Sequence, residues 1–286
     1  MIQNTQIKCS IEDMHQVQLE ILKEFKRICD LNNIKYYLAC GSCLGAIRDH
    51  GFIPWDHDAD VFVYANDIKK LLNVREQFDE RYFLQGKETD PEFNYSIYRL
   101  RDSYTTCIEK CDVNLDINHG FCIDIYPLYY APTNRVSLQL NIIFSYIYRI
   151  CIAGRVPLNH GKFLKLCSKI ILTLYRGKKR QKKILSCYSH LMKYQNTDKV
   201  LTYFGLDVTP TSAILYEKSW FDVPSKILFE GVKFSGPTNP EAYLKMKYGK
   251  YMELPPVEDR TPKFDELEYA DVQNGYKQFK GVYYKQ

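Results

Sequence analysis

The first 130 residues show a helical repeat followed by alternating strand and helix patterns. Apolar side chains recur every three or four positions from residue 12 to residue 31, and Ser10 with Asp13 forms a capping pair at the start of this predicted helix. Shorter helices are predicted at 43–49 and 66–78. Runs rich in β-branched and aromatic residues predict strands at residues 34–40, 58–64, 82–85, 95–101, 105–109 and 122–126. This order predicts a mixed sheet with helices packed on it.

The hydrophobic pattern changes after residue 130. Residues 131–195 predict helices and no strand, residues 196–240 are rich in turns, and residues 240–251 predict a short helix. We expect an α+β (mixed α/β) fold, with a mixed sheet flanked by helices and an added helical region. The expected divisions are a core at 10–130, a basic helical insertion at 131–195, and a C-terminal region at 196–286 that completes the same domain.

A chain of 286 residues can bury its own core without disulfide bonds. Near its start it holds Lys8, Glu12 and Asp13 rather than the apolar stretch of a secretory signal. We therefore expect the ten cysteines to be reduced thiols and the protein to be cytoplasmic. The most apolar stretch, residues 138–153, is interrupted by polar and charged residues, so we expect no membrane span.

Positive charge is concentrated in the predicted helical insertion. Residues 125–197 contain thirteen Lys and Arg residues and no Asp or Glu, although the net charge of the whole chain is only +5. Within them, residues 160–183 combine a basic helical face with an apolar face, which is typical of a helix that lies on an anionic membrane. A packed helix with a solvated basic face has the same pattern, and both alternatives stay open. No nucleic-acid-binding motif accompanies the charge, so we expect no nucleic-acid partner.

One stretch near the start of the chain combines residue types that suit phosphate and metal chemistry. Gly41 and Ser42 lie between a predicted strand and a predicted helix, where backbone N–H groups and the helix dipole attract an anion. Asp56, Asp58 and Asp60 follow at alternate positions. Side chains two residues apart on a strand point to the same face. Carboxylates this close repel one another unless a cation lies between them.

Asp124 is the expected third acid, because it is alone in an apolar predicted strand. Asp58, Asp60 and Asp124 offer the hard oxygen ligands that Mg²⁺ or Mn²⁺ prefers, and such an ion would neutralise a substrate phosphate. Asp56 is expected to be a loop residue. The alternative for Asp56, Asp58 and Asp60 is a solvated turn with capping aspartates, and for Asp124 it is a satisfied structural acid.

Three motifs make the sequence similar to a known family. They are Leu-Gly-Ala-Ile-Arg at 44–48, Gly-Phe-Ile-Pro-Trp-Asp-His-Asp-Ala-Asp at 51–60 and Ile-Asp-Ile-Tyr-Pro-Leu at 123–128. They resemble motifs of the LicD family, bacterial phosphocholine transferases related to the fukutin group, with a nucleotidyltransferase fold. The resemblance extends over roughly residues 20–260. His57 departs from it, since the family usually has an Asp at that place.

The resemblance implies a reaction and roles for the residues. A CDP-linked alcohol, most often CDP-choline, would give its phospho-alcohol group to a sugar hydroxyl of a cell-surface glycan (lipopolysaccharide, teichoic acid or capsule), and CMP would leave. Asp58, Asp60 and Asp124 would be the catalytic acids and metal ligands, with Asp124 either a base or a metal-bridging acid. Gly41 and Ser42 would form the nucleotide-phosphate turn. An enzyme with this acceptor is expected in the cytoplasm, peripheral at the inner face of the cytoplasmic membrane.

Other side chains are expected to bind substrate. The resemblance implies that Arg48 contacts a substrate phosphate. Arg99 and Arg101 share one face of a predicted strand, and either could bind a diphosphate or pair with a local acid. Trp55 is a candidate for the aromatic surface that a quaternary ammonium requires.

Rival functions remain open from the sequence. One is a nucleotidyltransferase that transfers a nucleoside monophosphate and releases pyrophosphate, and another is an inactive glycan-binding relative. Cys40 and Cys43 form a C-x-x-C motif that could be redox-active, or could bind zinc together with Cys107 and Cys111. Small buried thiols explain these four cysteines more simply.

Overall fold

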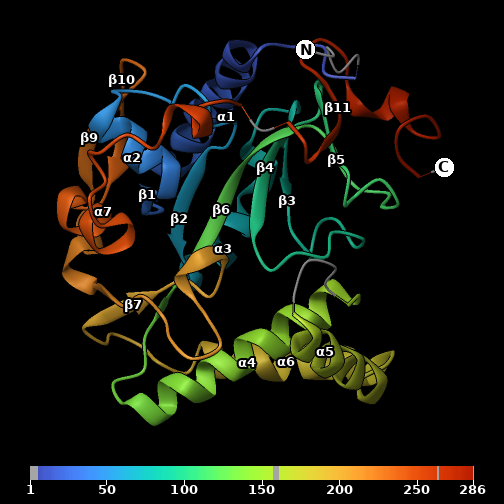
Figure 1. Cartoon of the computed structure of the whole chain (residues 1–286), viewed down its shortest axis with the longest axis vertical. Helices are drawn as coiled ribbons and strands as arrows, with labels where there is room; N and C mark the ends of the chain where they lie inside the picture. The colour runs from blue at the N-terminus through green and yellow to red at the C-terminus, as the bar shows by residue number, and fades with distance from the viewer. Residues whose placement is uncertain (1–5, 157–160, 263, 286) are drawn as a thin grey trace.

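The computed structural model describes residues 6–156, 161–262 and 264–285, and a mixed seven-stranded sheet lies at its centre (Figure 1). The main path of the sheet has the order β1-β2-β6-β4-β3. The strands are β1 (Tyr36–Leu38), β2 (Asp60–Tyr64), β3 (Tyr82–Gln85), β4 (Tyr98–Asp102) and β6 (Phe121–Tyr130). β2 and β6 run parallel, and the other neighbours on this path are antiparallel. The expected mixed α/β class is confirmed.

Helix α1 (Ile11–Leu31) covers one face of this sheet. The predicted capping box is present: Ser10 Oγ accepts a hydrogen bond from the backbone N–H of Asp13 at 3.1 Å, and the Asp13 carboxylate accepts one from the N–H of Ser10 at 2.9 Å. The apolar side of α1 is buried, and the ring of Phe25 meets that of Tyr36 edge-on with centroids 5.3 Å apart. The predicted amphipathic helix is therefore confirmed.

Helices α2 (Cys40–Arg48) and α7 (Pro240–Tyr248) pack together on the opposite face. Phe62 of β2 meets the ring of Tyr243 edge-on at 6.0 Å. α2 begins three residues before its predicted start, so Gly41 and Ser42 lie within its first turn and not in a turn before it. The chain can pass from β1 into α2 this abruptly because Cys40 adopts a positive φ of 45°.

Three smaller pairings complete the β structure, and all draw on the turn-rich C-terminal region. β6 continues into a pairing with β7 (Lys199–Leu201), which pairs with β8 (Tyr216–Glu217). β9 (Ser225–Phe229) and β10 (Val232–Gly236) form a hairpin. β11 (Leu267–Asp271) pairs with β5 (Thr106–Glu109), so the end of the described chain lies beside the core.

The remaining short elements follow the strands. Helix α3 (Ala65–Asn73) comes directly after β2 and contacts β2 and β6. The predicted helix at 66–78 thus divides into α3 and a separate 3₁₀ turn. The 3₁₀ turns are η1 (Arg75–Gln77), η2 (Gly205–Asp207), η3 (Lys218–Phe221), η4 (Val257–Asp259) and η5 (Tyr276–Phe279).

Three helices form a separate layer at the lower end of the molecule in Figure 1: α4 (Arg135–Ala153), α5 (Lys162–Leu174) and α6 (Lys178–Leu191). α4 packs mainly against α6, and the ring of Phe144 stacks on His190 at 4.0 Å. Within the described ranges, α4 is the one helix long and apolar enough to cross a membrane, and about a third of it is buried inside the protein. Part of the predicted basic segment, residues 157–160, lies outside the described residues.

Candidate active site

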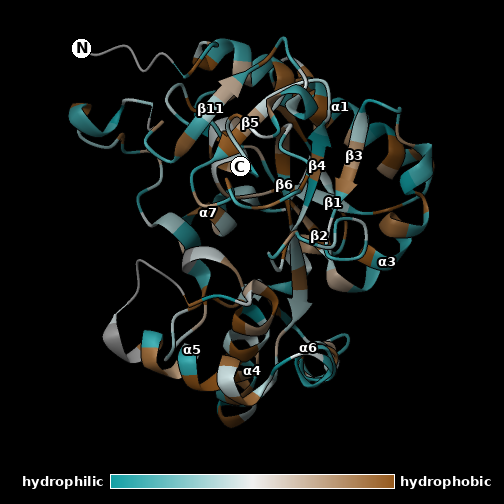
Figure 2. Ribbon diagram, turned by 90° about the vertical axis from the view of Figure 1, so that its right-hand side faces the viewer, coloured by the Kyte–Doolittle hydropathy of each residue, from teal (hydrophilic) through white to brown (hydrophobic). Residues whose placement is uncertain are grey.

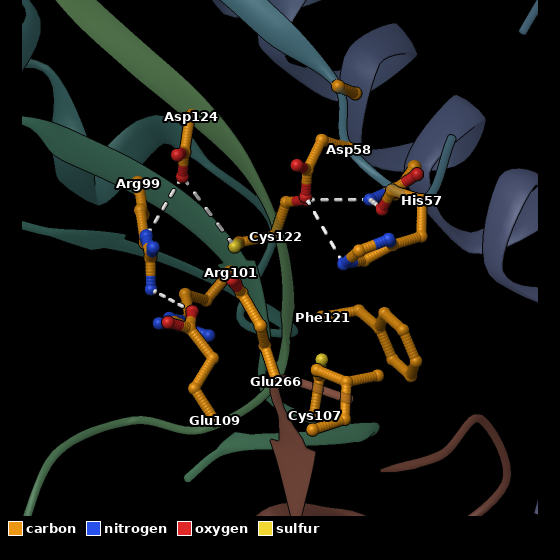
Figure 3. Close-up of a pocket in the computed structure, with 13 residues that line it drawn as sticks. His57, Asp58, Arg99, Arg101, Cys107, Glu109, Phe121, Cys122, Asp124 and Glu266 are labelled. Atoms are coloured by element: carbon orange, nitrogen blue, oxygen red, sulfur yellow. Dashed lines mark hydrogen bonds and ion pairs between the residues drawn. The ribbon is translucent and has the colours of Figure 1, made fainter. Parts of the chain in front are cut away.

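The parallel pairing of β2 with β6 places two acids side by side. Asp60 and Asp124 are direct register partners, so their side chains leave the sheet on the same face. Arg99 of β4 is the register partner of Asp124 on the other side. Asp58 precedes Asp60 by two residues and lines the same pocket as Asp124 (Figure 3). The structure thus places Asp60 beside Asp124 on the sheet and Asp58 with Asp124 in one pocket.

Helix α1 holds the acidic loop in place from the sheet's other side. The Gln18 side-chain amide donates to the carbonyl of His57 at 2.6 Å and to that of Cys122 on β6 at 3.3 Å. His15 stacks on Phe52 at 4.2 Å, and its Nε2 lies 2.6 Å from the carbonyl oxygen of the neighbouring Asp56. Two polar side chains of α1 therefore hold in place the two residues that precede Asp58.

Gly41 and Ser42 contact the acidic loop directly. The buried Ser42 hydroxyl accepts a hydrogen bond from the backbone N–H of Asp60 at 2.8 Å. A Cβ at Gly41 would lie 2.6 Å from Oδ2 of Asp56. The Asp56 carboxylate therefore lies against the first turn of α2, where the helix dipole favours negative charge. The same geometry suits a substrate phosphate.

Burial and mutual repulsion make two of these acids reluctant to ionise. Burial raises the pKa of Asp60 well above its usual value, and the charges of Asp58 and Asp124 raise it further. The pKa of Asp58 is raised to about 6, first because surrounding protein atoms displace water, and also because Asp124 and Asp56 are near. The Asp58 side chain is nevertheless 66% exposed, so a ligand can reach it from solvent.

The donor set fits a divalent cation. The three acids are near enough to repel one another, but among the described residues the acid and thiol ligand atoms that all lie within 4.8 Å of one another belong to Glu109, Cys111 and Asp112. No described group donates a hydrogen bond to the Asp60 carboxylate, which is only 8% exposed. A buried carboxylate without donors is costly unless a cation compensates its charge. Oxygen-only ligands suit Mg²⁺ or Mn²⁺ better than softer metals.

Arg99 already has partners in this structure. It is buried, and its Nε donates to Asp124 at 2.8 Å while its Nη1 donates to Glu109 at 2.7 Å. The Asp124 carboxylate also accepts from the Tyr126 hydroxyl at 3.2 Å. Burial alone would raise the pKa of Glu109, but the guanidinium groups of Arg99 and Arg101 lower it to about 2. Arg99 thus links the Asp124 side of the site to β5.

A cavity of about 120 Å³ lies beside the acids and is lined by Asp58, Asp124, Arg99 and Arg101 (Figure 3). Arg101 is almost fully buried, with Nε donating to the Gln85 side chain at 2.7 Å and Nη1 to the carbonyl of Gly120 at 2.6 Å. Both arginines share the face of β4 that faces the site, as the sequence spacing predicts, because they are register partners of Asp124 and Cys122 on β6.

Arg48 and Trp55 lie next to each other and are not among the residues that line this cavity. The Arg48 guanidinium is 5.8 Å from the centroid of the Trp55 ring and pairs with Asp49 at 2.9 Å. The structure therefore joins these two predicted substrate contacts to each other, and the Asp49 carboxylate neutralises the arginine.

The cysteines do not form the alternative sites. All ten are unpaired thiols, as expected. Burial raises the pKa of Cys40 well above its usual value, and burial raises that of Cys43 as well, which opposes formation of the reactive thiolate. The alternative zinc site would need Cys40 and Cys43 beside Cys107 and Cys111. Cys43 is buried in α2, whereas Cys107 lies on β5 and lines the acidic cavity, so the two halves of that site lie on different elements.

Comparison with known proteins agrees with this arrangement. Residues 33–144, which include α2, β2, the acidic loop and β6, match the family described as LicD/FKTN/FKRP, nucleotidyltransferase domain. Residues 33–144 are therefore a LicD-family nucleotidyltransferase domain. The lipopolysaccharide cholinephosphotransferase LicD of Haemophilus influenzae is 25% identical over 264 residues, which is 89% of this chain and 96% of that protein.

Two animal members of the same family match a shorter part. The ribitol 5-phosphate transferase FKRP of mouse and that of human are each 32% identical over 130 residues, 42% of this chain and 22% of the animal proteins. These similarities support a phosphoalcohol transferase, and the matched part contains the acids that the structure brings together.

Helix α7, which lies outside the matched part, also carries residues near the acids. Tyr243 of α7 accepts a hydrogen bond from the backbone N–H of Cys40 at 3.0 Å, at the start of α2. Lys247 lies one turn further along α7, pairs with the buried Asp207, and its charge favours the ionised form of Asp60. Their four-residue spacing marks one helix face, but nothing in the sequence indicates that this face meets α2.

Proposed function

We propose that this protein transfers a phospho-alcohol group, phosphocholine from CDP-choline in the first instance, to a sugar hydroxyl of a cell-surface glycan and releases CMP. One observation carries the proposal: the register of β2 with β6 aligns Asp60 and Asp124 within the part of the chain that matches the LicD family. The similarity to a cholinephosphotransferase over nearly its whole length supports the choice of phosphocholine.

The proposed cofactor is Mg²⁺ or Mn²⁺, held by Asp58, Asp60 and Asp124. Bound there, it would neutralise the phosphates of the donor and stabilise the departing oxygen. The first turn of α2, with Gly41 and Ser42, would orient a donor phosphate through its backbone N–H groups.

The role of Asp124 follows from its contacts. Its two oxygens accept hydrogen bonds from Arg99 Nε and from the Tyr126 hydroxyl, and these fix the direction of the carboxylate. A group held this way is suited to bridge to a metal ion. We therefore favour the metal-bridging role over that of general base, which requires an oxygen free to take the proton of the attacking hydroxyl.

A donor screen tests the proposal. The unfolding midpoint of the full chain would be measured with CDP-choline, CDP-ethanolamine, CDP-glycerol, CDP-ribitol or CTP, each with and without Mg²⁺ or Mn²⁺. A ligand that binds the folded state raises the midpoint, and we expect CDP-choline with metal to give the largest rise. A larger rise with CTP would support nucleotidyl transfer instead, and a larger rise with CDP-ribitol would reassign the donor.

A further inference from the structure

The surface formed by α5 and the start of α6 has an unusual composition. Three large apolar side chains of α5 are more than half exposed: Leu166 (57%), Ile170 (51%) and Leu174 (62%). They recur at four-residue spacing and therefore form one row along the helix. In Figure 2 this layer forms the lower end of the molecule, and hydrophobic and hydrophilic residues lie side by side along α5.

Basic residues lie beside this apolar row and continue beyond its end. Five exposed cations lie on α5, in the linker and on the first half of α6: Lys169, Arg176, Lys178, Lys179 and Lys182. Only the linker at 175–177 separates the two helices, so Leu174 and the first cations are close neighbours. We call the apolar row and these five cations the basic helical surface.

The cations of this surface have no acidic partners. Among the described residues, none of the five forms an ion pair, and residues 125–197 contain no Asp or Glu that could supply one locally. Helix α1 shows the contrast: its Lys23, Lys26 and Arg27 each pair with an acid three or four residues away. An ordinary solvated helix face resembles α1, with opposite charges interspersed. The basic helical surface does not.

We propose that the basic helical surface docks the protein on an anionic lipid bilayer. Unpaired cations next to exposed Leu and Ile side chains match the two layers of a membrane interface, since anionic headgroups attract the cations and the acyl boundary accepts the apolar row. A second protein chain would have to supply both acids and an apolar groove. The charge excess therefore favours the bilayer, where anionic groups surround each cation.

The helical layer that carries this surface contacts the region of the candidate active site, because α4 packs against both α5 and α6. After α4, Arg155 donates to the carbonyl of Cys111 at 2.8 Å and lies 3.6 Å from the Asp112 carboxylate, in the turn that follows β5. Glu109 at the end of β5 lines the acidic cavity and pairs with Arg99. Docking through α5 and α6 would therefore hold the cavity in a fixed orientation relative to the bilayer.

Vesicle flotation of the full chain tests the proposal. Wild type would be mixed with vesicles of phosphatidylcholine alone or with about one third phosphatidylglycerol, at low and high salt. We expect binding to the anionic vesicles only, weakened by salt because the attraction is electrostatic. Binding to neither kind of vesicle would overturn the proposal, and so would equal binding to both.

Matched variants locate the surface. K179E/K182E is expected to weaken binding to anionic vesicles at least tenfold, since each basic residue near the surface contributes roughly fivefold to partitioning. K233E/K245E makes the same change of net charge at two exposed lysines on β10 and α7 and should leave binding unchanged. L166S/I170S tests the apolar row, and its thermal unfolding curve shows whether it folds. Equal loss in both charge-reversal variants would overturn the proposal, because it would reflect net charge alone.

A second copy of the chain is the competing occupant. Light scattering of the wild type without lipid distinguishes it, because a dimer that covers this row would be lost in L166S/I170S. We expect both the wild type and L166S/I170S to be monomers in the absence of lipid. The bilayer proposal would be overturned if the wild type were a dimer that does not bind vesicles and L166S/I170S were a monomer. That result would assign the surface to self-association.

Discussion

Asp60 and Asp124 are direct register partners in the parallel pairing of β2 with β6, and Ser42 fixes the Asp60 backbone from the adjoining helix. Two carboxylates on neighbouring strands repel each other, so the arrangement lowers the stability of the fold. Such a cost is common at functional sites and rare elsewhere.

Asp60→Asn should raise the stability of the metal-free protein and abolish its stabilisation by metal. At pH 7 the neutral side chain removes the cost of burying a charge and the repulsion from Asp58 and Asp124, and we expect the free energy of unfolding without metal to rise. Added Mn²⁺ should stabilise the wild type and not the variant. Calorimetry in EDTA and in Mn²⁺ checks both. If Mn²⁺ stabilised the two equally, the metal would bind elsewhere.

Arg99→Met should be strongly destabilising. The side chain is buried between Asp124 and Glu109, and its removal leaves two carboxylates without their shared cation. We expect a loss of about 3 kcal/mol in denaturant unfolding. Arg75→Met is the control, because the side chains of its pair with Glu76 are 46% and 83% exposed, and its removal should cost at most about 1 kcal/mol. Similar losses in the two variants would contradict this account of Arg99.

The register of β4 shows how much the sequence could predict. The alternation of residues 99–101 correctly predicts that Arg99 and Arg101 share a face, and the boundaries of β3 agree with the prediction, because local spacing determines both. The approach of α7 to α2 and the pairing of β11 with β5 could not be predicted, since both join segments far apart in the chain. Lys247 and Glu109 were missed as site residues for the same reason.

Lys247→Met should reduce both stability and activity, and a double variant separates the two effects. The single change leaves Asp207 buried with only the Tyr216 hydroxyl as its partner, at 2.7 Å, and should cost about 3 kcal/mol. K247M/D207N should recover most of the stability. If Lys247 acts on the acids or on a donor phosphate, the double variant should still have at least about tenfold lower turnover. Full recovery of turnover would show that Lys247 is purely structural.

Gly41→Ala should lower activity more than stability. The new Cβ would lie 2.6 Å from Oδ2 of Asp56, so that flexible carboxylate must move away from the start of α2. We expect less than about 1 kcal/mol of destabilisation, because the atom that must move is the end of a side chain. Turnover should fall at least about tenfold, since small displacements near a reacting phosphate are costly. Gly161→Ala, where a Cβ meets no atom within 4 Å, should change neither quantity.

The contribution of His119 to stability should decrease as the pH falls from 6.5 to about 4, while Asp58 and Asp60, whose pKa values are raised, contribute in the opposite direction. His119 is buried, and burial first, then Arg101, lowers its pKa to about 4, so the unfolded chain takes up a proton in this range before the folded one does. The loss should reach at most about 3 kcal/mol. Glu109, with a folded pKa of about 2, acts at lower pH: its contribution is present above about 4.5 and is lost as the pH falls towards 2.

His119→Gln isolates the first of these ranges. Measured by urea unfolding at several pH values, the free energy of unfolding of the variant should rise relative to that of the wild type as the pH falls from 6.5 to 4.5, and the two should change in parallel below pH 4. A variant with the same slope as the wild type in the upper range would show that other groups cause the acid sensitivity.

Identification of the released nucleotide tests the central claim most directly. The full chain would be incubated with CDP-choline, Mg²⁺ or Mn²⁺ and a panel of glycan acceptors, and with CTP in parallel, and the products separated by chromatography. We predict CMP from CDP-choline in proportion to the phosphocholine found on a glycan, with a loss of at least about a thousandfold in Asp60→Asn. Pyrophosphate release from CTP, or undiminished CMP release by Asp60→Asn, would contradict the account.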